Sequence, residues 1–322
     1  MSGTPIRIAT RASGLALWQA DHVAGLMRRA APHLSVELVH VTTAGDRDRT
    51  AALAAIGTLG LFTREVQSAL LDRRADVAVH SLKDLPTEPV DGLVLAGVPE
   101  RASPHDVLVL PRKGDSTSPS TVEGREALSM LAPEARVGTG SLRRRAQLLH
   151  LRSDLEMRDV RGNVETRIQK LDGGEFDALV LAEAGLRRLE LASRIACVLC
   201  PPLMYGAVGQ GALGLECRGD DDELRTLLES ISHPPSRLAV TAERALLARL
   251  KAGCHAPLGV STNLGAERLT LTAVALSPDG SERIAAESSG PAGDPHRVAE
   301  DVANALVAQG AARWITSPDR ET

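Results

Sequence analysis

Hydrophobic positions along the first third of the chain fall into short apolar runs separated by longer amphipathic stretches. The short runs predict strands, and the stretches, whose apolar residues recur with a helical period, predict helices. Strands are predicted at 6–10, 36–42, 77–80, 93–97 and 107–110, and helices at 15–29 and 62–73. Ser13 stands where an N-cap belongs, just ahead of the first helix. This alternation predicts a largely parallel sheet with helices on its faces.

A second series of the same kind follows the segment 113–123, whose glycine, serine, proline and threonine residues are typical of a linker. Its strands are predicted at 136–139, 155–160 and 178–182, with Gly173-Gly174 as a helix stop. The glycine-rich segment 206–211 lacks both the dinucleotide-binding spacing and the lysine of a P-loop, so we interpret it as a hinge. The extended segment 214–217 that follows it is compatible with pairing in either sheet.

The last part of the chain has a different pattern, which begins after His233-Pro-Pro-Ser236. It contains a helix, three alternating strands and a final helix, predicted at 238–250, 258–262, 269–276, 283–288 and 296–309. Pro278-Asp-Gly280 is typical of the turn in a hairpin between the last two strands. This pattern predicts a small α+β domain.

The chain is therefore predicted to be an α/β protein with three domains. The first α/β lobe is predicted to extend to residue 112, the second comprises 117–206, and the α+β domain comprises 235–322. The length of 322 residues agrees with this division, because chains of that size form more than one hydrophobic core.

Composition narrows the classes of function. Aromatic residues make up 2% of the chain and the net charge is −4, which argues against a protein that binds nucleic acid by stacking or phosphate attraction. Four cysteines are too few for a disulfide framework at this length. No apolar run is long enough to span a bilayer, and the first residues lack the pattern of a secretory signal. We expect a cytoplasmic protein with reduced thiols and no nucleic-acid or membrane partner.

Two segments place arginines at the start of predicted helices: Val137-Gly-Thr-Gly-Ser-Leu-Arg-Arg-Arg145 and Arg161-Gly-Asn-Val-Glu-Thr-Arg167. A helix start presents unpaired backbone N–H groups and the positive end of the helix dipole. Guanidinium forks at such a point bind planar carboxylates or phosphates. Two helix starts of this kind predict a polyanionic ligand. No glycine fingerprint or magnesium ligand accompanies them, which favours carboxylates over phosphates.

Ser81-Leu-Lys-Asp84 directly follows a short apolar strand. A carboxylate beside an ammonium group at a strand end is a candidate acid/base or cation-stabilising unit. The alternative is a surface Lys–Asp pair that shapes the turn before Pro86.

Cys254 lies in the small-residue segment Lys251-Ala-Gly-Cys-His-Ala-Pro257, just past a predicted helix. Small neighbours leave a thiol accessible, and His255 is placed to help deprotonate it; the alternative is an ordinary loop cysteine. Cys197 and Cys200 form a lone Cys-x-x-Cys without a second pair or a nearby histidine, which disfavours a zinc site. Motifs of metal-dependent and serine hydrolases are missing from the sequence.

Taken together, these segments resemble the porphobilinogen deaminase (hydroxymethylbilane synthase) family over nearly the whole chain. The matching segments, in the family's order, are Arg7-Ile-Ala-Thr-Arg-Ala-Ser13 with Leu15-Ala-Leu-Trp-Gln19, Ala78-Val-His-Ser-Leu-Lys-Asp84, Val137-Gly-Thr-Gly-Ser-Leu-Arg-Arg144, Arg161-Gly-Asn163, Ala184-Gly-Leu-Arg-Arg-Leu189, Ala207-Val-Gly-Gln-Gly211, Thr241-Ala-Glu-Arg-Ala245 and Gly253-Cys254. Most are weak alone, but eight in this order are very specific.

The resemblance implies two lobes like the halves of a type II periplasmic binding protein, and a third domain that carries Cys254. It also implies that the chain returns to the N-terminal lobe after the second one, so that the N-terminal lobe comprises residues 1–112 and 212–232. It implies a transferase that joins four porphobilinogen units head to tail, with loss of ammonia, into the linear tetrapyrrole hydroxymethylbilane during porphyrin and haem biosynthesis. A dipyrromethane cofactor attached to Cys254 by a thioether primes the chain. Asp84 is the implied catalytic carboxylate, and Lys83 and Arg11 are the other implied catalytic residues.

The same resemblance implies the residues that bind cofactor and substrate. They are Ser13, Phe62, Ser81, Lys83, Thr139, Ser141, Arg143, Arg144, Arg161, Arg167, Arg188 and Gln210. No metal is implied. The expected protein is a monomer that passes its product to uroporphyrinogen-III synthase.

Two other functions fit parts of the pattern. A non-catalytic carboxylate-binding or sensing protein with the same two lobes needs neither Asp84 nor Cys254. A cysteine-nucleophile acyltransferase needs the Cys254 and His255 side chains within hydrogen-bond distance, which neighbours along a chain seldom achieve.

Overall fold

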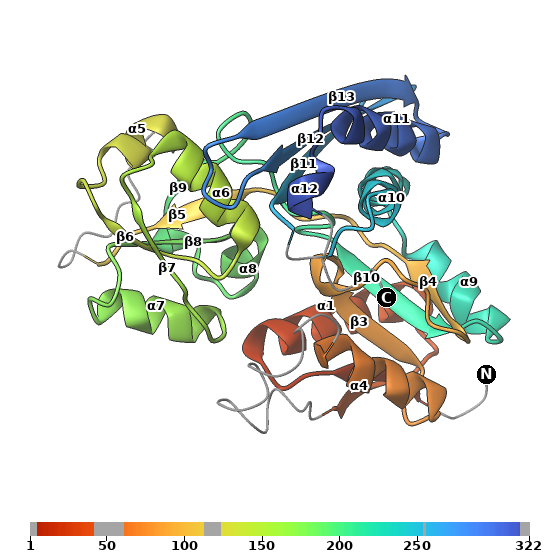
Figure 1. Ribbon diagram of the computed structural model, residues 1–322. Helices are drawn as coiled ribbons and strands as arrows, with labels where there is room; N and C mark the ends of the chain where they lie inside the picture. The colour runs from red at the N-terminus through yellow and green to blue at the C-terminus, as the bar shows by residue number, and fades with distance from the viewer. Residues whose placement is uncertain (1–4, 42–60, 113–123, 254–255, 316–322) are drawn as a thin grey trace. The chain divides into compact units, whose positions relative to one another are not determined.

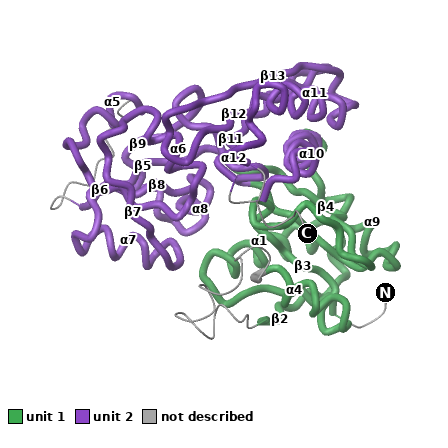
Figure 2. The backbone as a smooth tube through the Cα atoms, viewed as in Figure 1, with its two compact units in different colours: residues 1–102, 212–237 green, residues 103–211, 238–322 purple. Residues whose placement is uncertain are grey.

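The computed structural model describes residues 5–41, 61–112, 124–253 and 256–315 (Figure 1). The chain divides into two compact units, shown in Figure 2. Unit 1 consists of residues 1–102 and 212–237, and unit 2 consists of residues 103–211 and 238–322. No helix within the described ranges combines the length and the apolar character that a membrane span requires.

Unit 1 is built on a mixed sheet, which has five strands in the described part of the chain. In spatial order they are β2 (Val36–His40), β1 (Ile6–Thr10), β3 (Val77–Ser81), β10 (Leu213–Arg218) and β4 (Leu93–Gly97). β1 runs parallel to β2 and β3, whereas β10 is antiparallel to both β3 and β4. The sheet is accompanied by α1 (Gly14–Ala30), α4 (Leu61–Leu71), the 3₁₀ turn η1 (Leu82–Asp84) and α9 (Asp222–Ser230).

Local sequence explains the first helix, α1. Ser13 has an extended backbone, and its hydroxyl accepts the backbone N–H of Ala16, which satisfies one of the free donors at the helix start. The buried residues of α1 recur on one face and pack with the strands of the sheet in a single core. Arg28 and Arg29 stand in the last turn, where positive charge is favourable to the helix dipole.

The α/β part of unit 2 repeats the strand order of unit 1. Its strands, again in spatial order and within the described residues, are β7 (Glu156–Arg158), β6 (Arg136–Gly138), β8 (Ala178–Ala182), β5 (Asp106–Val109) and β9 (Ile195–Leu199). β6 is parallel to β7 and β8, and β5 is antiparallel to β8 and β9. The helices are α5 (Gly124–Ser129), α6 (Leu142–Leu151), α7 (Val164–Asp172), α8 (Glu183–Arg188) and the turn η2 (Ala192–Arg194).

An identical ion pair fixes the register of the two sheets. In unit 1, Arg7 donates its backbone N–H and its guanidinium to Asp76, and the Asp76 N–H returns to the Arg7 carbonyl. In unit 2, Arg136 and Asp177 make the same set of bonds. Each aspartate directly precedes the strand that pairs with the arginine's strand. We call this arrangement the Arg–Asp lock; it makes each central strand pair register-specific.

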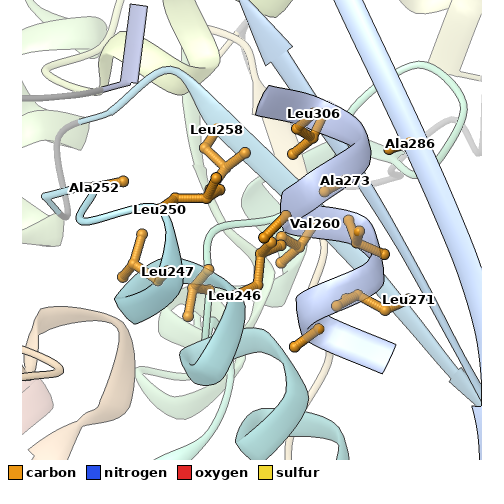
Figure 3. Close-up of a cluster of buried hydrophobic side chains, with 14 of the residues drawn as sticks. Leu246, Leu247, Leu250, Ala252, Leu258, Val260, Leu271, Ala273, Ala286 and Leu306 are labelled. Carbon is orange, nitrogen blue, oxygen red and sulfur yellow. The ribbon is translucent and has the colours of Figure 1, made fainter. Parts of the chain in front are cut away.

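The C-terminal part of unit 2 is a three-stranded antiparallel sheet with helices, as far as the described residues go. It comprises β11 (Leu258–Leu264), β12 (Arg268–Leu276), β13 (Arg283–Pro291), α11 (Pro295–Ala308), α12 (Ala312–Ile315) and most of α10 (Pro234–Arg249). Figure 3 shows its core, in which Leu246 of α10 and Leu250, directly after that helix, cluster with Val260, Leu271 and Leu306.

The turn between β12 and β13 contacts α6. Gly280 has a φ of 75°, and a Cβ there would lie 2.6 Å from the carbonyl oxygen of Ala146. This left-handed backbone and close approach both require glycine. Ala146 and Tyr205 share a small core with Val274 and Leu276. The α+β part is therefore packed directly on the α/β part within unit 2.

The structure confirms two α/β sheets and a small α+β part, and it corrects three details of the sequence prediction. The boundary expected at residue 112 is misplaced, because β5 pairs with β8 and β9 of the second sheet. The sheets are mixed and not largely parallel, because β10 and β5 run against their neighbours. The second and third predicted domains form one compact unit. The segment at 214–217, compatible with either sheet, lies in the first.

Candidate active site

In unit 1, the turn after β3 presents the predicted catalytic pair. Leu82 and Leu85 are buried on either side of it, and the Leu82 N–H donates to the carbonyl of Ala212 at 3.0 Å. Between these apolar anchors, Lys83 is half-buried and Asp84 is exposed. The turn thus holds a carboxylate and an ammonium group at the surface, on a backbone that is fixed by the two buried leucines and the Leu82 hydrogen bond.

The strand end that leads into this turn is held by side chains of α1. The amide of the buried Gln19 donates to the hydroxyl of Ser81 at 2.8 Å. Thr10, at the end of β1, donates its hydroxyl to the Ala16 carbonyl at 3.1 Å. Because β1 and β3 are parallel neighbours, their carboxyl ends lie at one edge of the sheet. Arg11 and Ser13 follow β1 at that edge, so the structure brings them to the same edge as Ser81, Lys83 and Asp84.

A buried polar cluster lies behind the turn. Nε2 of His80 is 2.8 Å from a carboxylate oxygen of Glu216, and Gln67 donates its amide to both oxygens of that carboxylate at 3.0 and 3.3 Å. The three residues come from β3, β10 and α4. They connect the strand that ends at Ser81 to its neighbour and to a covering helix, which stiffens the base of the turn.

In unit 2, the carboxyl end of β6 carries the first arginine segment. The hydroxyl of Ser141 accepts the Arg144 N–H at 3.4 Å and caps α6, and the hydroxyl of the buried Thr139 accepts the Ser141 N–H at 3.2 Å. The predicted helix start is therefore present. Two of its arginines, however, point inward: the exposed fractions of Arg143 and Arg144 are 4% and 6%.

Both guanidinium groups bind the carboxylate of Asp106, which is completely buried. Nη1 of Arg143 lies 2.6 Å from one oxygen of Asp106, and Nε of Arg144 lies 2.8 Å from the other. Burial alone would raise the pKa of Asp106. The positive charges of Arg143 and Arg144 outweigh burial and hold the pKa of this carboxyl well below its usual value.

The same cluster includes the segment interpreted as a hinge. Arg143 also donates to the carbonyl of Tyr205 at 2.6 Å. Gln210, which is fully buried, donates to Asp106 at 3.1 Å and to the carbonyl of Pro104 at 2.8 Å. Gln210, expected at a ligand, is therefore an interior residue that bonds protein groups. Its role in ligand binding stays a prediction.

The second arginine segment begins α7. Asn163 caps this helix by accepting the Thr166 N–H at 2.9 Å, and Gly162, with a φ of 113°, precedes it. Arg161 is exposed and Arg167 is half-buried, with its Nε donating to the Gly162 carbonyl at 2.8 Å. These two arginines are more accessible than Arg143 and Arg144.

Arg188, at the end of α8, is buried and donates to the carbonyl of Gly211 at 2.8 Å. Burial lowers the pKa of its guanidinium to about 10.

Gln19 in unit 1 and Asp106 in unit 2 each hold residues of the candidate site, and the sequence prediction missed their roles. Gln19 appears in a matching segment, but nothing in its local pattern marks it as the partner of Ser81. Asp106 opens an otherwise apolar strand, where a charge has no local reason to be. That charge was the available signal, because a buried carboxylate requires cationic partners.

Three of the cysteines lie in the described residues. Cys197 and Cys217 are buried, which raises the pKa of both thiols, that of Cys217 to about 11, and Cys200 is exposed. No group of three potential metal ligands occurs within the described residues. Cys254 and His255 lie outside the described residues, and so does the side chain of Phe62.

Family models match both parts of the chain. The model for "Porphobilinogen deaminase, dipyromethane cofactor binding domain" matches residues 6–226, and the model for "Porphobilinogen deaminase, C-terminal domain" matches residues 237–308. The chain belongs to the porphobilinogen deaminase family. The first match covers both five-stranded sheets, and the second covers most of the α+β part.

Curated relatives are similar to this chain over nearly its full length. A porphobilinogen deaminase of Syntrophotalea carbinolica is 43% identical over 99% of this chain and 98% of its own. A porphobilinogen deaminase of Chromobacterium violaceum is 45% identical over 97% of both chains. Among solved structures, the VFT2 domain of Bordetella pertussis BvgS aligns with 73% of this chain and 91% of its own, with 17% identity and a TM-score of 0.40. The relatives confirm the resemblance to porphobilinogen deaminase seen in the sequence motifs.

Proposed function

We propose that this protein is a hydroxymethylbilane synthase, a transferase that joins four porphobilinogen molecules head to tail with release of ammonia. One observation carries the proposal: relatives named porphobilinogen deaminase are 43–45% identical over nearly the whole chain. The anchored turn with Lys83 and Asp84 supplies the kind of groups that the reaction needs.

Each pyrrole unit brings an acetate and a propionate, so the growing product is a polycarboxylate. The chain offers cationic side chains on the segments that follow strands of both sheets: Arg11, Lys83, Arg161 and Arg167, with Arg143, Arg144 and Arg188 buried in unit 2. Charge-assisted pairs with guanidinium groups bind carboxylates in a defined orientation without a metal ion. We propose Ser13, Ser81, Thr139 and Ser141 as neutral hydrogen-bond partners of the same ligands.

Asp84 is the proposed catalytic carboxylate. When porphobilinogen loses ammonia, the bond from its aminomethyl carbon to nitrogen breaks with the electron pair going to nitrogen, and positive charge develops on the pyrrole. A fixed carboxylate at that point stabilises the charge in the transition state. Lys83, next to Asp84, is proposed to bind a substrate carboxylate.

The residues present fit a dipyrromethane cofactor. The donor set at the helix starts consists of guanidinium and hydroxyl groups, which match a group with four carboxylates. The matched family domain binds this cofactor. When bound, the cofactor supplies the nucleophilic pyrrole carbon that is extended. Cys254, outside the described residues, is the proposed attachment point through a thioether, and Arg143, Arg144, Arg161, Arg167 and Arg188 are the proposed holders of its carboxylates.

We further propose a cytoplasmic monomer that hands hydroxymethylbilane to uroporphyrinogen-III synthase. The net charge of −4 and the ordinary globular composition support a protein that acts on a free small molecule.

Intact-mass analysis of the purified protein tests the proposal. We expect the mass of one dipyrromethane in addition to the chain, and we expect Cys254→Ser to lack it. Asp84→Asn is expected to keep the adduct and lose most turnover. A wild-type chain that is produced in cells able to make porphobilinogen and carries no adduct would contradict the proposal, and would favour the carboxylate-binding alternative.

A further inference from the structure

Asp106 has no role in the motif-based site, although it contacts two of the proposed ligand-binding arginines. We propose that Asp106 is a positioning residue, which fixes the guanidinium groups of Arg143 and Arg144 in the orientation in which they bind ligand carboxylates. This inference rests on the proposed function, because it assigns those arginines to cofactor and substrate.

The contacts are those of a rigid support. The Asp106 carboxylate accepts from Nη1 and Nη2 of Arg143 at 2.6 and 3.3 Å, from Nε of Arg144 at 2.8 Å, and from Gln210 at 3.1 Å. A free arginine side chain has many rotamers, whose loss on binding costs affinity. Two guanidinium groups already held by a buried carboxylate do not incur that cost when a ligand arrives.

The fold itself does not require a charge at this position. In the sheet of unit 1, β10 takes the place of β5, and Leu213 opposes Ser81 where Asp106 opposes Ala182 in unit 2. The same topology is therefore built with a buried leucine. Buried ion pairs contribute little to stability over apolar residues of similar volume. Unit 1 has a leucine where unit 2 has Asp106. We therefore infer that the Asp106 carboxylate is present because it holds the two arginines.

Asp106 also links the arginines to the segment that leads the chain back to unit 1. Gln210 bonds Asp106 and the Pro104 carbonyl, and Arg143 bonds the Tyr205 carbonyl. A Cβ on Gly206 would lie 2.6 Å from that same Pro104 carbonyl, so the backbone there is closely packed. Besides the carboxylate, Arg143 is therefore fixed by the Tyr205 carbonyl, and Arg144 is fixed by the Val180 carbonyl at 3.0 Å.

The test compares Asp106→Asn, which keeps the shape and removes the charge, with Asp106→Glu, which keeps the charge and shifts it by one methylene. Asp177→Asn is the matched control, because it breaks a bidentate Arg–Asp pair of the same sheet away from the arginine cluster. Steady-state constants for porphobilinogen are measured and normalised to the cofactor-loaded fraction from intact mass. We expect KM to rise about tenfold in Asp106→Asn with kcat within about threefold, a smaller rise in Asp106→Glu, and wild-type KM in the control.

A second measurement does not depend on catalysis. The Nε–H of Arg144, bonded to a buried carboxylate, is expected to give a slowly exchanging signal in ¹⁵N NMR spectra of the wild type and of Asp177→Asn, and to lose it in Asp106→Asn. An unchanged KM in Asp106→Asn, or an equal rise in the control, would overturn the positioning role. A wild type with neither adduct nor turnover would contradict the proposed function instead. In that case the NMR signal still tests Asp106: its loss in Asp106→Asn supports the positioning role, and its persistence contradicts it.

Discussion

The two α/β lobes share a strand order and an Arg–Asp lock, yet they use their strand ends differently. After β3, unit 1 presents the half-buried Lys83 and the exposed Asp84. After the corresponding strand β8, unit 2 continues into α8 with Glu183, a buried carboxylate that accepts from Arg187 and from Ser103. One lobe leaves its carboxylate available, and the other pairs its carboxylates with protein groups.

This difference teaches that the scaffold determines where chemistry takes place, and a few residues determine what kind. Parallel strands bring their carboxyl ends to one edge in both sheets, as expected of open α/β folds. In unit 1 that edge carries the proposed catalytic carboxylate. In unit 2 the helix that follows that edge begins with Arg143 and Arg144, which are buried and held by Asp106 and are proposed to bind ligand carboxylates.

The largest expected effect on stability follows from removing the charge of Asp106. Asp106→Asn leaves two buried guanidinium groups without their anion, and breaking such a pair costs about 3–5 kcal/mol of unfolding free energy. Urea unfolding followed by circular dichroism measures it. A loss below about 1 kcal/mol would mean that the cluster is not a stabilising element of unit 2.

Asp84→Asn is expected to behave in the opposite way. Its side chain is exposed, so Tm should stay within about 2 °C of the wild type. Turnover of porphobilinogen should fall at least about a hundredfold, because a neutral amide does not stabilise a developing cation. Thermal unfolding and ammonia release are measured on the same preparation; a marked fall in Tm, or full turnover, would contradict the contrast with Asp106.

The two Arg–Asp locks should differ in strength. Asp76 is more buried than Asp177 and also binds Arg218 at 2.9 Å, whereas the ion pair of Asp177 in the described part of the chain is with Arg136. We expect Asp76→Asn to cost about 1.5–3 kcal/mol. Asp177→Asn, whose pair is only partly buried and is screened by solvent, should cost less than about 1 kcal/mol. Equal losses in urea unfolding would show that solvent exposure does not distinguish the locks.

Low pH is expected to lower the free energy of unfolding, because it protonates the carboxylates of Asp76 and Asp106. The pKa values of Asp76 and Asp106 are lowered in the folded state. Burial opposes both shifts, but the neighbouring arginines outweigh it. Groups with lowered folded-state pKa values contribute stability above their unfolded pKa, near 4, and that contribution is lost as pH falls below it. Urea midpoints from pH 7 to pH 3 should fall steeply below about pH 4, and less steeply for Asp106→Asn.

The smallest expected effect is on the reactivity of the cysteine thiols, which allows one strand in each five-stranded sheet to be compared. Cys217 of β10 and Cys197 of β9 are buried with raised pKa values, so both should react slowly with a thiol reagent at pH 7. Cys200 is exposed and should react first. Peptide mapping after brief labelling measures this order; fast labelling of Cys217 would indicate that the sheet of unit 1 opens readily.

The sequence by itself determined the local elements and the family. The predicted strands at 6–10, 93–97 and 178–182 coincide with β1, β4 and β8, and the Ser13 cap is present. Apolar periodicity and capping are local properties, so a single chain reveals them. The motif order likewise led to porphobilinogen deaminase, which the family models confirm.

Only the tertiary structure decided which sheet takes β5 and what the arginines contact. Asp106 and Arg143 are 37 positions apart, and Asp106 and Gln210 are 104 apart. Burial and pairing across such distances depend on strand order, which local patterns do not encode. The arginines at the helix start were visible in the sequence, but the buried carboxylate that holds two of them emerged only when the sheet was assembled.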